Sequence, residues 1–367
     1  MPLEPIRRGD FVDADRAAVQ DEVIRAVEGN PDAFIERYKD HPDSLGGRYV
    51  CADLFKETFE QFSASPEARN RYNTPVHNAA AVLAAEQYRR AIADDSEPER
   101  DTAIFLTGIP GAGKTSFVLQ DGDVPSNARV VYEGQLAKPE TTIPKLQQAI
   151  DAGVKPIILV VHAPPEMALE NTFRRFNEEG RGASIGVMAS IQAGLPACLH
   201  QVHQHFGEAV QLHVIDRRDK FHAKALEGWH HLQVLESEGN HEQIKHRLGS
   251  ALDHHRAAGT ISDACYAQAA GLAPLGPNQG LDSEGDRRFG QDGQRRDVPE
   301  EGRPGAALRV ADRLTPGEQA LVVGELRNDA MKRLEALGKA PGQARQDHPA
   351  ERPVHAQGQK PGRGVRR

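Results

Sequence analysis

A glycine-rich segment in the first third of the 367-residue chain constrains the fold more than any other feature. Residues 108–115 read Gly-Ile-Pro-Gly-Ala-Gly-Lys-Thr and satisfy the pattern G-x-x-x-x-G-K-[ST]. The apolar run 102–107 precedes this segment, and we expect a helix to begin at Lys114. In a strand–loop–helix unit of this kind, glycines let consecutive backbone N–H groups face a phosphate, and the helix adds the positive end of its dipole. The segment therefore predicts the phosphate-binding loop of a nucleoside triphosphate site.

The same loop predicts the contacts of ATP and of Mg²⁺. Lys114 is expected to bridge the β- and γ-phosphates, and the Thr115 hydroxyl is expected to hold the metal ion. The other predicted nucleotide contacts are Gly108, Ile109, Pro110, Gly111, Ala112, Gly113 and Ser116. The loop by itself does not separate a kinase from a nucleotide-dependent switch or motor.

Short apolar runs alternate with helical patterns after the loop. The runs span 128–132, 156–161 and 210–215, and the helical patterns span 144–152, 165–179 and 184–206. Such alternation is typical of a parallel sheet with helices on both faces. The predicted fold class is therefore α/β, with a P-loop NTPase-like parallel sheet.

Composition divides the chain into four parts. Residues 1–45 are polar and predict a short helical extension, and residues 46–220 form the predicted α/β core. Residues 221–271 read as a histidine-rich helical extension. The region 272–367 lacks the apolar content that offsets the entropy of ordering, so we expect it to be largely disordered, with one helix near 315–338.

Charge and composition argue against several classes of protein. The net charge of −8 argues against a basic nucleic-acid-binding surface. No apolar run has the length of a membrane span, and the N-terminus lacks the apolar stretch of a secretory signal. The cysteines Cys51, Cys198 and Cys265 are far apart and fit free thiols in a reducing cytosol. The histidines lack the spacing of zinc ligands. We expect a cytoplasmic protein without a membrane partner.

Segments downstream of the loop follow one another in an order shared with a known kinase family. Glu133-Gly134 ends an apolar run, Arg174-Arg175 lies in a later helix, and Gly180-Arg181 follows that helix. Over about residues 46–220 the chain resembles the zeta-toxin family of P-loop kinases. The resemblance implies that Arg175 and Arg181 contact the ATP phosphates, with Arg174 as the alternate for Arg175. It also implies that Glu133 holds magnesium through water or contacts the acceptor.

One motif of that family stands at a different place in this chain. The family carries a strand ending in Asp-x-Phe-Lys after the P-loop helix, and its Asp is the catalytic base. Here residues 116–127 leave no room for it, but Asp53-Leu-Phe-Lys56 follows an apolar run upstream of the loop. Thr74-Pro-Val-His77 then resembles the next segment of the family. The resemblance implies a circularly permuted core in which Asp53 is the base and Thr74 and His77 belong to the acceptor site.

Other interpretations of these residues remain open. Asp53 could cap a helix or form a structural ion pair, and Asp121 or Asp123 could be the base. Thr74-Pro75 could simply start a helix. Arg175 and Arg181 could pair with the neighbouring glutamates Glu178 and Glu179.

The resemblance implies a kinase that moves the γ-phosphoryl group of ATP to a hydroxyl of a small molecule. Nucleotide sugars such as UDP-N-acetylglucosamine are the leading acceptors it implies, with dinucleotides second. It also implies toxicity and an antitoxin partner, and residues 1–45 could instead inhibit the site in cis. A nucleotide-switched ATPase scaffold and a non-toxic metabolite kinase remain the alternatives.

Overall fold

A six-stranded sheet forms the centre of the computed structural model, which describes residues 3–115, 124–219 and 223–272. The strand order across the sheet is β1-β3-β2-β4-β5-β6. The strands are β1 (Tyr49–Cys51), β2 (Thr102–Thr107), β3 (Ala128–Glu133), β4 (Lys155–His162), β5 (Gln211–Asp216) and β6 (Lys224–Glu227). Neighbouring strands from β1 to β5 are parallel, as the sequence predicts.

The edge strand β6 corrects the helical prediction for the start of the 221–271 segment. It pairs antiparallel with β5, from His213 opposite Glu227 to Asp216 opposite Lys224. Its four residues, Lys-Ala-Leu-Glu, have no strand preference of their own. The unpaired edge of β5 supplies hydrogen-bond partners that local sequence cannot reveal.

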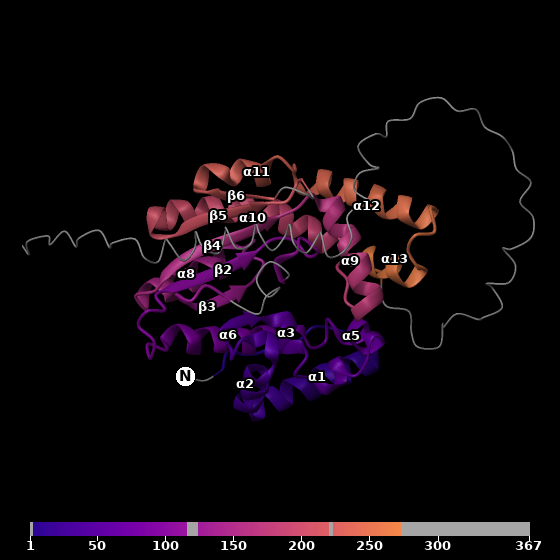
Figure 1. Ribbon diagram of the computed structural model, residues 1–367. Helices are drawn as coiled ribbons and strands as arrows, with labels where there is room; N and C mark the ends of the chain where they lie inside the picture. The colour runs from indigo at the N-terminus through magenta and orange to yellow at the C-terminus, as the bar shows by residue number, and fades with distance from the viewer. Residues whose placement is uncertain (1–2, 116–123, 220–222, 273–367) are drawn as a thin grey trace, which may run out of the picture.

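Helices cover both faces of the sheet (Figure 1). One face packs against α1 (Ala14–Gly29), α2 (Pro31–Asp40), α3 (Ala52–Lys56), α4 (Glu60–Ser63), α6 (His77–Ala93) and α8 (Pro139–Asp151). The other packs against α9 (Pro165–Glu179), α12 (His241–Ala257) and α13 (Asp263–Ala269), and α10 (Ile185–Phe206) contributes to both. The short helices α5 (Pro66–Tyr72) and α11 (Gln233–Glu236) and the 3₁₀ turns η1 (Pro42–Ser44), η2 (Gly207–Ala209) and η3 (Trp229–Leu232) complete the described chain.

The residues of β2 show why this strand is an uninterrupted apolar run. Ala103 and Phe105 belong to one hydrophobic core, and Ile104 and Leu106 belong to the other. Side chains alternate between the faces of a sheet, so a strand covered on both sides is apolar at every position.

Helix α8 begins five residues before the predicted helix 144–152, at Pro139. Proline is well suited to the first turn of a helix, because its missing N–H has no intrahelical partner there. The predicted helix near 315–338 and the predicted disorder of 273–367 lie outside the described residues.

The N-terminal helices α1 and α2 are part of the hydrophobic core. They lie beneath α3 and α6 in Figure 1, and their buried side chains join the cluster that contains Phe55. The Tyr38 ring stacks on the Phe55 ring with 3.6 Å between centroids. The Tyr38 hydroxyl donates to the Tyr49 carbonyl at 2.6 Å and accepts from the Cys51 N–H at 3.0 Å. Residues 1–45 therefore hold β1 in place.

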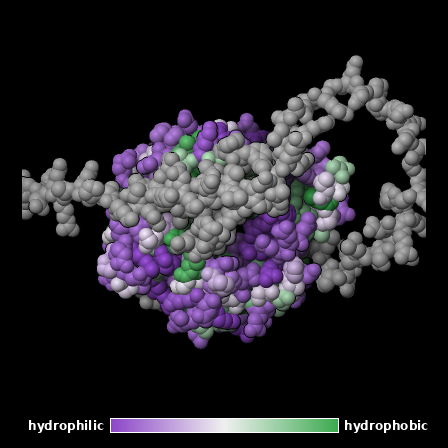
Figure 2. Space-filling view, in the orientation of Figure 1, coloured by the Kyte–Doolittle hydropathy of each residue, from purple (hydrophilic) through white to green (hydrophobic). Residues whose placement is uncertain are grey.

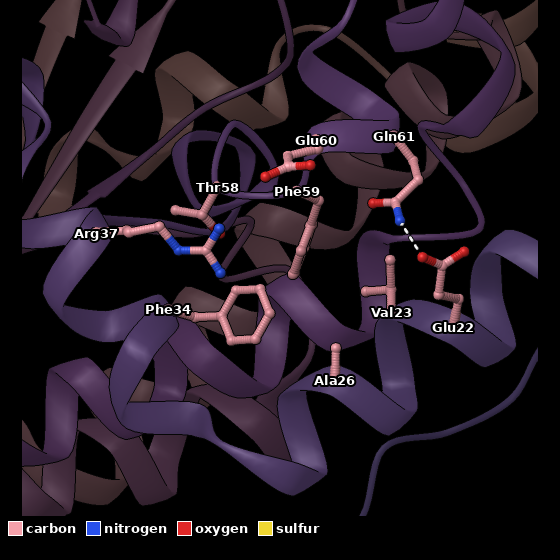
Figure 3. Close-up of a pocket in the computed structure, with 9 residues that line it drawn as sticks. All are labelled: Glu22, Val23, Ala26, Phe34, Arg37, Thr58, Phe59, Glu60 and Gln61. Atoms are coloured by element: carbon pink, nitrogen blue, oxygen red, sulfur yellow. Dashed lines mark hydrogen bonds between the residues drawn. The ribbon is translucent and has the colours of Figure 1, made fainter.

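A hollow of about 160 Å³ lies between α1, α2 and the start of α4 (Figure 3). Phe34 and Phe59 line it, and Gln61 Nε2 donates to Glu22 Oε1 across one side at 2.6 Å. Its volume is below the roughly 300 Å³ at which ligand pockets begin. The hollow is a packing gap and not the nucleotide site.

The described surface visible in Figure 2 is mostly hydrophilic, with scattered hydrophobic residues. Among the helices of the described chain, none is long and apolar enough to cross a membrane.

Replacing Tyr38 with Phe should lower the free energy of unfolding by about 1–3 kcal/mol, because a buried carbonyl and a buried N–H of β1 lose their partner. Urea denaturation of the full-length protein measures this change. Tyr266→Phe is the matched control, since the Tyr266 hydroxyl makes an exposed hydrogen bond to Asp253 at 3.0 Å. Equal unfolding midpoints for both variants would show that α2 does not hold β1 through this hydroxyl.

Candidate functional site

Three parallel strands end side by side at one edge of the sheet. Cys51 at the end of β1 is in register with Glu133 at the end of β3, and Glu133 is in register with Leu106 of β2. Asp53 lies two residues after the end of β1, and Gly108 directly follows β2. Ligands of open α/β sheets bind outside the carboxyl ends of the strands. The structure thus places Asp53, Glu133 and the glycine-rich loop on the ligand-binding edge.

The glycine-rich loop has a backbone that only glycine adopts readily. Gly108, Gly111 and Gly113 have φ angles of +138°, +82° and +91°. A Cβ on Gly108 would lie 2.2 Å from the Val161 carbonyl oxygen, and one on Gly111 would lie 2.0 Å from the Ala168 carbonyl oxygen. The helix after the loop begins at Lys114 as predicted, whereas Ser116, Asp121 and Asp123 lie outside the described residues.

Side chains bind the carbonyl groups of the loop from several directions. Lys114 Nζ donates to the Gly108 and Ile109 oxygens at 3.0 and 3.1 Å. Asn171 Nδ2 of α9 donates to the Gly111 oxygen at 2.8 Å. Arg217 Nη1, after β5, donates to the Ala112 oxygen at 2.7 Å. The sequence did not predict roles for Asn171 and Arg217, although both lie in segments that resemble the zeta-toxin family.

Oxygen atoms that could bind a metal ion lie near Lys114 and Thr115. Glu133 Oε1 lies 3.7 Å from Lys114 Nζ, and Glu133 accepts a hydrogen bond from the Tyr49 hydroxyl. Burial and the Glu133 charge raise the pKa of Tyr49 well above its usual value, and Tyr49 also interacts with the Thr115 side chain. Carboxylate and hydroxyl oxygens are suitable ligands for Mg²⁺. No group of three or more His, Cys, Asp or Glu side chains in the described chain could hold a metal ion by itself.

Asp53 lies in a pocket of positive charge. Lys56 Nζ, whose side chain is 3% exposed, donates to Asp53 Oδ1 at 2.8 Å and to Asn73 Oδ1 at 2.6 Å. Arg181 Nη2 lies 3.2 Å from Asp53 Oδ2. Desolvation favours the neutral acid, but Lys56 and Arg181 outweigh it and hold the pKa of Asp53 well below its usual value. Asp53 is therefore a carboxylate near neutral pH. It is not the N-cap of α3, which is Cys51.

The Cys51 thiol is close enough to Glu133 and Asp53 to feel both charges. Burial, and then the charges of Glu133 and Asp53, raise its pKa to about 12. The thiol stays protonated and is not a nucleophile.

The ion pairs around Asp53 continue through Glu57, a carboxylate for which the sequence predicted no role. Glu57 Oε1 lies 3.7 Å from Arg181 Nη1, and Arg69 of α5 binds Glu57 through both carboxylate oxygens at 2.9–3.2 Å. The loop that carries Arg181 is anchored on α5: a Cβ on Gly180 would lie 1.8 Å from the Pro66 carbonyl oxygen. Glu57 directly follows the Asp-x-Phe-Lys motif, but its partner Arg69 is distant in sequence and could not be inferred from spacing.

Arg175, Thr74 and His77 lie around this cluster. Arg175 forms an ion pair with Glu179 at 3.6 Å, which is one of the alternatives that the sequence left open. It also lies one helical turn after Asn171, on the same face of α9; the neighbouring Arg174 is exposed. The pKa of His77 is lowered by desolvation and by Lys56, while Asp53 opposes the shift. Thr74 is exposed and accepts the His77 N–H at its carbonyl at 3.2 Å.

Replacing Lys56 with Met should raise the pKa of Asp53 by about one unit or more, because an adjacent positive charge stabilises the carboxylate. In the unaltered protein Asp53 should stay ionised as the pH falls through about 4, the usual pKa of aspartate. In Lys56→Met the carboxylate should take up its proton at a distinctly higher pH. Carbon NMR of a labelled Asp53 carboxyl measures both curves.

Lys39→Met is the control for that titration, since Lys39 pairs with Glu36 on the surface of α2. Superimposable Asp53 titration curves for Lys56→Met and Lys39→Met would contradict the electrostatic account of this site.

Comparison with known proteins adds a family to this geometry. Residues 126–227 match the model of the Zeta toxin family, and no curated protein matches the chain. The matched segment runs from just before β3 to the end of β6 and includes Glu133, Arg175, Arg181 and Arg217. The P-loop and Asp53 precede it. The function that this family suggests is that of a P-loop kinase. Residues 126–227 are thus similar to the Zeta toxin family, and the glycine-rich loop lies upstream of this segment.

Proposed function

We propose that the protein is an ATP-dependent phosphotransferase that moves the γ-phosphoryl group to a hydroxyl of a small molecule. The observation that carries this proposal is the position of Asp53. It is an ionised carboxylate, paired with Lys56 and Arg181, at the sheet edge that also holds the phosphate loop. A nucleotide switch needs the loop but has no need of a second charged site at the same sheet edge.

The proposed reaction divides between the two sides of the site. The N–H groups of the loop and Lys114 bind the phosphates. The acceptor oxygen forms a bond to the γ-phosphorus while the bond to the β–γ bridging oxygen breaks, and its electrons leave with ADP. Asp53 takes the proton of the acceptor hydroxyl. Because phosphoryl transfer has a loose transition state, positioning and charge matter more than a strong base, and a carboxylate of low pKa is suitable.

Magnesium would neutralise charge on the β- and γ-phosphate oxygens when bound. Thr115 and Glu133 would hold it, Glu133 through water. Their oxygens are hard donors of the kind Mg²⁺ prefers, and the contacts from Tyr49 and Lys114 orient Glu133 toward the loop.

Arg181 and Arg175 are the proposed cationic partners of the transferred group. Arg181 lies between Asp53 and Glu57, so its charge is next to the proposed proton acceptor. Arg175 lies one turn from Asn171, whose side chain reaches the loop. Fixed positive charges near the transferred oxygens stabilise the transition state.

The strand order supports the proposal of a permuted core. β1, which leads into Asp53, comes first in the chain but lies two strands from the P-loop strand β2, with β3 between them. A parallel strand can occupy the same position in a sheet whichever way the chain enters it. Side chains of α1 and α2 pack in the same hydrophobic core as Val50 of β1. We therefore propose that residues 1–45 support β1 and do not inhibit the site.

The resemblance also suggests the chemical class of the acceptor. A nucleotide sugar such as UDP-N-acetylglucosamine is the first compound to test, with Thr74 and His77 as proposed acceptor contacts. The family is associated with antitoxins, and we propose that such a partner would act by covering the ATP site.

The test is phosphoryl transfer by the full-length protein with γ-labelled ATP, Mg²⁺ and a panel of nucleotide sugars, dinucleotides and small metabolites. Asp53→Asn keeps the size of the side chain but removes the carboxylate, so transfer should fall by about 10²–10⁴-fold while ADP binding is retained. Asp253→Asn on α12 is the control and should transfer label at the wild-type rate.

Release of free phosphate at equal rates from wild type and Asp53→Asn, with no labelled acceptor, would reject the kinase. That result would favour the ATPase scaffold.

A further inference from the structure

We propose that Asn171 and Arg217 are positioning residues that fix two peptide groups of the phosphate loop, so that its N–H groups are turned toward the nucleotide before it binds. The inference rests on the proposed nucleotide binding, and it assigns a task to two side chains that the proposed reaction leaves unused. It is carried by two hydrogen bonds that reach consecutive loop carbonyls from separate elements.

The loop needs such a device because glycine lets its peptide groups turn over easily. Gly111 and Gly113 both have φ values in the left-handed region, where glycine has no steric preference for one sign of φ. If the peptide after Gly111 or Ala112 turned over, its carbonyl would point at the phosphates. A carbonyl oxygen facing a phosphate is repulsive, whereas an N–H at the same place binds it.

Asn171 holds the first of these peptides from α9. Its Nδ2 donates to the Gly111 oxygen at 2.8 Å. The helix itself is a firm support, because Ala168, Leu169 and Phe173 are buried in the core on that face of the sheet. The α9 backbone also touches the loop directly: a Cβ on Gly111 would lie 2.0 Å from the Ala168 oxygen.

Arg217 holds the next peptide from the end of β5. Its backbone N–H donates to the His162 carbonyl at 2.8 Å, which ties the residue to the end of β4. Its Nη1 donates to the Ala112 oxygen at 2.7 Å. A Cβ on Gly113 would lie 1.9 Å from that nitrogen, so the guanidinium fills the space that this glycine leaves open.

Side-chain donors bind half of the carbonyl groups of residues 108–115. Lys114 binds the Gly108 and Ile109 oxygens, while Asn171 and Arg217 bind those of Gly111 and Ala112. A bound phosphate would draw Lys114 away from its carbonyl partners, whereas we expect Asn171 and Arg217 to keep their hydrogen bonds to the loop. Asn171 and Arg217 therefore keep the loop in its binding conformation, which lowers the cost of ordering it around a ligand.

The test is the equilibrium affinity for ADP, measured by calorimetry on the full-length protein. Asn171→Asp keeps the shape of the side chain, removes the donor and opposes the Gly111 oxygen with negative charge, so the Kd should rise about tenfold or more. Arg217→Met should have a similar effect, and Arg217→Lys, which keeps a charged donor, should recover part of the loss.

Two further readouts separate positioning of the loop from a general loss of structure. The melting temperature without nucleotide should stay close to that of wild type. In Asn171→Asp the ADP affinity should recover at acid pH, because the introduced carboxyl then carries a proton and can donate again. Asn177→Asp, the same change at an exposed position of α9, is the control and should leave the Kd unchanged.

Wild-type ADP affinity in both Asn171→Asp and Arg217→Met would overturn this inference alone. Absence of ADP binding by the wild-type protein would overturn the inference together with the proposed function.

Discussion

The pairing of β1 with β3 is the interaction on which the site depends. β1 has three residues, yet its register with β3 sets the end of β1 beside Glu133, and the pairing of β3 with β2 sets Glu133 beside the phosphate loop. The backbone hydrogen bonds to β3 are too few to hold so short a strand by themselves. The Tyr38 hydroxyl binds the backbone of β1 at two points, and its ring stacks on Phe55 of α3. The N-terminal helices thus fix the position of Asp53 by holding β1, the strand that precedes it.

Charge explains how the two halves of the site differ. Around the loop, where we propose that the backbone N–H groups and Lys114 bind phosphate, Glu133 is the nearby acid. Around Asp53, Lys56 and Arg181 keep a carboxylate ionised in partly desolvated surroundings. Glu57 and Arg69 extend this arrangement into a chain of alternating charges that reaches α5. The buried charge here is Lys56, whose side chain is 3% exposed and needs a charged partner, whereas the Asp53 side chain is 48% exposed.

The sequence predicted what local patterns encode. The parallel strands and the limits of α9 follow from apolar runs and helix periodicity, and the structure confirms them. Glycine spacing predicts the loop, and Gly108, Gly111 and Gly113 have positive φ angles there. The sequence missed β6, because that strand forms only against the free edge of β5. It also missed Asn171, Arg217, Glu57 and Arg69, because what they do is defined by partners far away in the chain. The contact of Arg217 with Ala112 joins residues 105 positions apart, which no motif spacing reveals.

The most direct test of this account is a crystal structure of the protein with ADP, Mg²⁺ and fluoroaluminate, a planar mimic of the transferred phosphoryl group. We expect the nucleotide phosphates in the loop of residues 108–115 and the fluoroaluminate between Lys114 and the Asp53–Arg181 pair, with the Asp53 carboxylate facing the aluminium on the side opposite ADP. A nucleotide bound elsewhere, or an Asp53 carboxylate turned away from the fluoroaluminate, would contradict the account.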